Sequence, residues 1–99
     1  MQPELYEYAA VQARKHYAGA RSALLAELET RDPAAGFDAS FHLSVRAMQL
    51  HVSSLSFAAK VWSGSFAYER AEAALVAQFP EFPIHVVANA FSTAYTDSR

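Results

Sequence analysis

A chain of 99 residues with 53% hydrophobic and only 18% charged side chains has the composition of a folded domain, which excludes intrinsic disorder. Its net charge of −2 gives no electrostatic footprint for nucleic acid, and its lack of cysteine excludes disulfides and thiolate chemistry. We therefore expect one helical domain over residues 1–99, in a cytoplasmic protein with no membrane span. An apolar share this high in so small a chain also favours oligomerisation.

The first helix is expected near residues 4–30, where Pro3 suits the first turn and most residues are good helix formers. Gly19 is predicted to mark a bend or a close approach of another backbone. Residues 32–36, which include a proline and a glycine, end this helix and form the first loop. The inward face is predicted to contain Tyr6, Ala10, Ala13, Tyr17, Ala20, Leu24 and Leu28.

A long central helix is expected near residues 38–63, with Asp38 or Ser40 as its N-terminal cap. Its main apolar stripe follows heptad spacing and is predicted to form the core of the domain. This stripe contains Phe41, Val45, Met48, Val52, Leu55, Ala59 and Trp62. A polar column runs beside it at the same spacing and contains His42, Arg46, Gln49, Ser53, Ser56, Lys60 and Ser63.

A second apolar column of the central helix needs separate cover, because it lies across the polar column from the main stripe. Small residues beside this column permit the close approach of another helix. We predict an isologous homodimer interface on this surface, since a two-fold pairing uses one patch twice. The predicted interface residues are Leu43, Ala47, Leu50, Ser54, Phe57 and Val61. In the alternative, the first helix covers this column and the chain is monomeric.

Two shorter helices are expected near residues 66–79 and 83–95, joined by a junction at Pro80–Pro83. Gly64 is placed at the C-terminal cap of the central helix, and Ser65 at the start of the next helix. Their inward residues are predicted to be Tyr68, Ala71, Leu75 and Phe79, then Ile84, Val87, Ala88, Phe91 and Tyr95. The predicted fold class is all-α, a small four-helix bundle-like domain with two long helices followed by two short ones.

The histidines do not form a metal motif, because no pair has the i, i+4 spacing that places two ligands side by side. We therefore expect no metal and no cofactor. His42 and Arg46 are i, i+4 neighbours, and a polar pocket that includes them and His51 is the basis of a ligand-binding or enzymatic alternative. No nucleophile, base and orienting group can be named together, so the predicted protein is not an enzyme.

The last two helices could form a helix-turn-helix, which makes a DNA-binding regulator a further alternative. The outward residues of the final helix are His85, Asn89, Ser92, Thr93 and Thr96, and Arg99 is its first basic residue. Phosphate contacts from lysine and arginine supply most of the affinity in such modules. We therefore expect no binding to nucleic acid.

One local resemblance covers about twenty residues. Leu75, Phe79 and Pro80, followed by Val86, Val87 and Phe91, resemble the first two helices of CUE-type ubiquitin-binding modules. That family would imply a third helix with paired leucines, which the residues after Phe91 do not contain. No function is carried over from this resemblance.

The sequence is most consistent with a non-enzymatic helical interaction protein, such as a regulator, an immunity-type inhibitor or an adaptor subunit. It would act through apolar helical surfaces on a protein partner or on itself, as a homodimer. Excess apolar residues and an aromatic share of 13% support this interpretation, because aromatic residues are enriched at interface cores.

Overall fold

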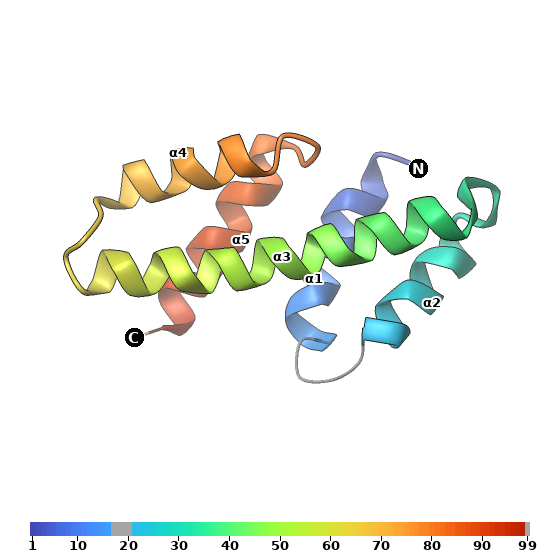
Figure 1. Ribbon diagram of the computed structural model, residues 1–99, viewed down its shortest axis with the longest axis horizontal. Coiled ribbons are helices and arrows are strands. Elements are labelled where there is room, and N and C mark those ends of the chain that lie inside the picture. The colour runs from blue at the N-terminus through green and yellow to red at the C-terminus, as the bar shows by residue number, and fades with distance from the viewer. Residues whose placement is uncertain (17–20, 99) are drawn as a thin grey trace. The chain divides into compact units, whose positions relative to one another are not determined.

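The computed structural model describes residues 1–16 and 21–98, and within these ranges the chain is helical and contains no strand. The all-α prediction is confirmed. Figure 1 shows the helices in chain order. They are α1 (Glu4–His16), α2 (Arg21–Arg31), the short 3-10 helix η1 (Pro33–Ala35), α3 (Gly36–Trp62), α4 (Tyr68–Gln78) and α5 (Ile84–Asp97).

The described chain divides into two compact units, Met1–Gln49 and Leu50–Arg99, and α3 contributes residues to both. One domain over the whole chain stays a prediction. The prediction of two long helices is wrong, because α1 ends at His16 and α2 begins at Arg21. Only α3 is long, with 27 residues. The predicted positions Tyr17, Gly19 and Ala20 lie outside the described residues.

The inward face of α1 agrees with the predicted stripe at Ala13 but not at Tyr6 and Ala10. Leu5, Ala9 and Ala13 are buried, whereas Tyr6 and Ala10 are only half-buried. The buried residues recur every four positions, as expected for one face of a short helix. The predicted stripe assumed a single helix that extended to Leu28, and two separate helices need not share one continuous face. Within α2, Leu24 and Leu28 are buried as predicted.

Polar contacts join α1 to α2 within the first unit. The hydroxyl of Tyr8 donates a 2.6 Å hydrogen bond to the carboxylate of Glu27, and the guanidinium carbon of Arg31 lies 3.8 Å from the centre of the Tyr8 ring. Near the start of the chain, the backbone N–H of Gln2 donates to Asp32 Oδ2 at 3.1 Å. These contacts fix the side of α1 that meets α2, because each joins residues far apart in sequence.

The buried face of α3 is not its predicted main stripe. Phe41 and Val52 are about half exposed, Ala59 is exposed, and Met48 is the one fully buried member of that stripe. The buried side chains lie on the other apolar side of the helix. They are Ser40, Leu43, Ser44, Ala47, Leu50, Ser54 and Ala58, together with Met48. The prediction that the main stripe forms the core is therefore wrong.

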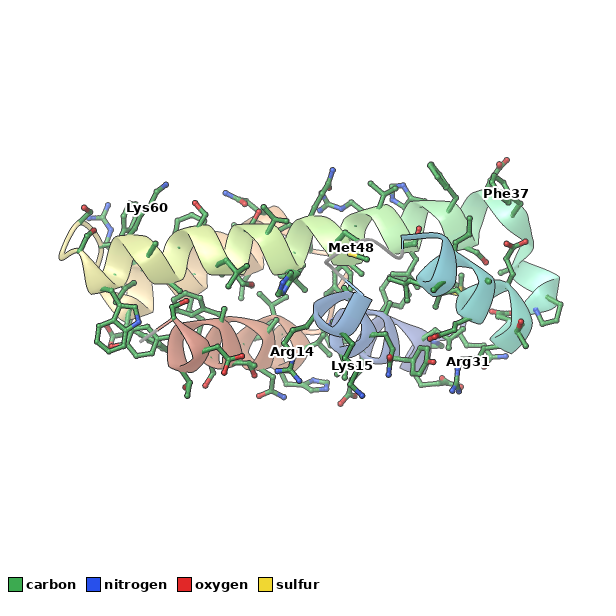
Figure 2. The ribbon with its side chains drawn as sticks, turned by 90° about the horizontal axis from the view of Figure 1, so that it is seen from below. Arg14, Lys15, Arg31, Phe37, Met48 and Lys60 are labelled. Carbon is green, nitrogen blue, oxygen red and sulfur yellow. The ribbon has the colours of Figure 1, made fainter. Side chains whose placement is uncertain are left out.

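The position of the small residues explains this exchange of faces. The buried side contains small residues such as Ser40, Ala47 and Ser54, beside which another helix can approach closely. In the first unit, Figure 2 shows α1 and α2 on the side of α3 opposite Phe37. The side rich in small residues is the side that is covered.

The start of α3 also differs from the prediction. The helix begins at Gly36, whose φ of +85° and ψ of 170° suit glycine almost exclusively. Asp38 then lies inside the first turn, where a carboxylate is favourable to the helix dipole. Ser40 is fully buried, and its hydroxyl has no hydrogen-bond partner. Ser40 is therefore not the cap of α3.

The helix α3 ends in a Schellman motif centred on Gly64. This motif confirms the predicted position of Gly64 near the C-terminal cap. Gly64 has a φ of +83°, its N–H donates to Val61 O at 3.0 Å, and the Ser65 N–H donates to Lys60 O at 2.9 Å. The predicted role of Ser65 at the next helix is wrong. Ala67 is the N-cap residue of α4, and the Ser65 hydroxyl instead lies 3.0 Å from that of Ser63.

The core of the second unit contains inward residues from α4, α5 and the junction between them. The buried set in these elements is Ala71, Leu75, Phe79, Phe82, Val86, Val87, Phe91 and Ala94. Four predicted inward residues, Ala71, Leu75, Val87 and Phe91, belong to it, and Phe79 is buried just beyond α4. Ile84 is 68% exposed, so its predicted inward position is wrong. It is the first residue of α5, and the inward face begins at Val86, two residues later.

Candidate functional site

Two phenylalanines at the start of α3 form an exposed aromatic surface in the first unit. Phe37 is 56% exposed and Phe41 is 50% exposed, and their rings are stacked with centroids 5.7 Å apart and planes 16° apart. Figure 2 shows Phe37 on the outer side of α3, away from α1 and α2. Scattered exposed apolar residues are normal, but a stacked pair is a contiguous apolar area that water solvates poorly.

A small recess lies beside this pair, where α2, η1 and α3 meet. Its volume is about 160 Å³, and it is lined by Glu29, Asp32, Pro33, Gly36 and Phe37. Ligand pockets usually measure about 300–1,000 Å³, so this recess has the size of a side-chain end rather than of a cofactor. We call it the Phe37 recess.

Asp32 is the most constrained side chain of the Phe37 recess. It is only 7% exposed, and its Oδ2 accepts the hydrogen bond from the Gln2 backbone. Its backbone is also fixed, because the N–H donates to Leu28 O at 3.0 Å and the carbonyl accepts from the Ala35 N–H at 3.2 Å. The carboxylate is therefore held in place, and Asp32 contributes a negatively charged residue to the lining of the recess.

The residues of the predicted dimer interface are covered within the chain to different degrees. Leu43, Ala47, Leu50 and Ser54 are buried, and Phe57 and Val61 are half-buried. Phe57 makes an edge-to-face contact with Phe66, with ring centroids 5.6 Å apart. A partner could reach the four buried side chains only if the chain opened. The homodimer and its predicted interface both stay predictions.

The predicted polar pocket is not brought together within the first unit. His42 is exposed, and the half-buried Arg46 donates a hydrogen bond from Nη1 to Gln49 Oε1 at 3.1 Å along the surface of α3. His51 belongs to the second unit, where it is half-buried. Among the residues that the structure describes, no group of three or more His, Cys, Asp or Glu side chains is placed to hold a metal ion.

The outer face of α5 carries the residues predicted for a reading helix. His85, Asn89, Ser92 and Thr96 are exposed, and Thr93 is half-buried. The sequence of α5 contains no lysine or arginine. The described lysine and arginine of this unit are Lys60 and Arg70, which lie over the Phe66 ring at 5.8 and 5.7 Å from its centre. Cation–π contacts of this kind hold these two side chains against the chain's own surface.

The fold and the site identify the chain only as a small all-helical protein with an exposed aromatic surface. Comparison with protein-family models, curated proteins and solved structures found no match in any of the three. Over the described part of the chain, no helix combines the length and the apolar character needed to cross a membrane.

Sequence reasoning missed the Phe37 recess for two reasons. Phe41 was assigned to the core because it begins the main heptad stripe, and residues 32–36 were interpreted only as a loop. Phe37 follows directly on a glycine whose φ is positive, so its direction depends on the exact turn between α2 and α3. The sequence feature that could have indicated this site is the pair of aromatic residues, Phe37 and Phe41, beside acidic residues. The same pattern also fits the buried start of a helix.

Proposed function

We propose that this chain is a non-enzymatic interaction protein that binds a protein partner through the Phe37–Phe41 pair. The single observation that carries the proposal is the exposure of two stacked phenyl rings at the start of α3. Aromatic side chains are enriched in interface cores, because they bury a large area with few rotatable bonds. A cytoplasmic location is part of the same proposal, supported by the absence of cysteine.

A comparison of the cell proteins captured by the wild-type chain and by its variants tests this function. Tagged wild-type protein, the Phe37→Ser/Phe41→Ser variant and a Val11→Ser control are incubated with native lysate, and captured proteins are compared by mass spectrometry. Val11 is a suitable control because it is 44% exposed and lies in the same unit. We expect a specific partner with wild type and the control, and its loss with the double variant. Equal capture by all three proteins would count against the proposal.

A homodimer is the self-binding form of this proposal. Light scattering of the wild type and of the double variant at tens of micromolar shows whether a second copy covers the phenyl pair. A doubled mass that returns to that of one chain in the double variant would identify this surface as the dimer interface. A single-chain mass in both proteins would leave a different protein as the partner.

A further inference from the structure

The charge around the Phe37–Phe41 pair specifies the chemistry of its partner. We propose that the Phe37 recess receives the ammonium or guanidinium group of a lysine or arginine from a partner protein, while apolar residues beside that cation cover Phe37 and Phe41. This inference rests on the proposed function, since it names the kind of partner that the same surface binds.

The lining of the recess favours a cation on three grounds. Glu29 and Asp32 contribute two carboxylates, and Asp32 is nine-tenths buried, so its charge is screened less than that of an exposed group. Phe37 also lines the recess, and the face of an aromatic ring attracts a cation that lies over it. The volume of about 160 Å³ admits the end of one side chain. An exposed third carboxylate, Asp38, follows Phe37 in the first turn of α3.

No lysine or arginine of the first unit whose side chain the structure describes lines this recess. The guanidinium of Arg31 lies on the Tyr8 ring, and Arg46 bonds to Gln49. Arg14 and Lys15 point away from α3 on the side opposite Phe37 (Figure 2). A second copy could offer Arg14 or Lys15 to the recess only in a head-to-tail contact, which forms a ring or an open filament rather than a two-fold dimer. A separate basic partner is therefore the occupant that we propose.

A pair of peptides tests the chemistry directly. The probe is a short fluorescein-labelled helical peptide with lysine and leucine on one face, and its match has glutamine in place of each lysine. Fluorescence anisotropy with the full chain measures both affinities. The salt concentration is about 0.15 M, because exposed charges more than about 8 Å apart are then screened and long-range attraction contributes little. We expect the lysine peptide to bind with a Kd below about 1 mM, and the glutamine peptide at least threefold more weakly.

Two variants with the same change in net charge locate the binding. Glu29→Gln removes a carboxylate from the recess, and Glu69→Gln removes an exposed one from α4 in the other unit. We expect Glu29→Gln to weaken the lysine peptide by about three- to fivefold, and Glu69→Gln by less than about twofold. Phe37→Ser should weaken both peptides, because it removes the shared apolar contact. Circular dichroism confirms that each variant remains helical.

Each other outcome overturns the inference in a distinguishable way. Equal binding of the two peptides, both weakened by Phe37→Ser, would retain the proposed function and remove the cation. Equal effects of Glu29→Gln and Glu69→Gln would place binding outside the recess. No binding below about 1 mM would remove the basic partner. A wild-type dimer that Phe37→Ser dissociates would make a second copy the occupant and end the proposal of a separate partner.

Discussion

The indole of Trp62 lies flat on the ring of Tyr95, with centroids 4.5 Å apart and planes inclined by 6°. The indole Nε1 also donates a hydrogen bond to the backbone carbonyl oxygen of Tyr95 at 2.9 Å. Both residues belong to the second unit, so this contact joins the end of α3 to the last turns of α5. Trp62 is thus an anchor within its unit, although about half of its surface remains exposed.

Trp62→Phe should reduce the free energy of unfolding by about 1–2 kcal/mol, because it removes the indole hydrogen bond and reduces the stacked area. Urea denaturation measures the change. Circular dichroism is used to follow it rather than tryptophan fluorescence, because the substitution removes the only tryptophan. The control is Ile84→Ala, which truncates a more exposed apolar side chain and should change stability by less than about 0.5 kcal/mol. Similar losses in the two variants would contradict an anchoring role.

Leu50→Glu and Val52→Glu separate the two sides of α3. Leu50 is 1% exposed and Val52 is 45% exposed. A charge at Leu50 would be buried without a partner, which costs several kcal/mol in a protein whose total stability is about 5–15 kcal/mol. We expect Leu50→Glu to lose cooperative unfolding and Val52→Glu to retain it, as measured by thermal circular dichroism. A folded Leu50→Glu protein would restore Leu50 as a candidate interface residue.

The hydrogen bond from Tyr8 to Glu27 should contribute about 1 kcal/mol to the stability of the first unit. Tyr8→Phe removes the hydroxyl and retains the ring that supports Arg31. A double-mutant cycle with Glu27→Ala isolates the coupling, because each single change also alters other contacts. Urea unfolding of the four proteins provides the measurement. A coupling energy near zero would show that water replaces this bond without loss.

Gly36→Ala should destabilise the protein more than Gly64→Ala. An added Cβ meets no atom within 4 Å at either position, so the difference must arise from the backbone. Gly36 combines φ +85° with ψ 170°, a region that side chains avoid at a cost of about 1–3 kcal/mol. Gly64 lies in a Schellman motif, where a non-glycine residue costs about 1–2 kcal/mol. Melting temperatures of both variants and of Gly64→Asn test the order, and we expect Asn to be the mildest change.

The sequence alone predicted the elements that local chemistry determines. The all-α class, the start of α3 within two residues and the end of α3 just before Gly64 follow from helix propensity, caps and a glycine that accepts a positive φ. The inward positions Ala71, Leu75, Val87 and Phe91 are buried as predicted. The helices α4 and α5 are short and each has one distinct apolar face, so periodicity left little choice of side.

Tertiary structure decided which face of α3 is buried, because that helix is apolar on more than one side. The heptad stripe that begins at Phe41 is largely exposed, whereas the column with Leu43 and Leu50 is covered. Sequence periodicity gives the residues that share a face, but helix approach distance, set by small residues such as Ala47, selects the covered face. The Phe37 recess has the same origin. It depends on where the turn after α2 directs the start of α3, and no local pattern encodes that direction.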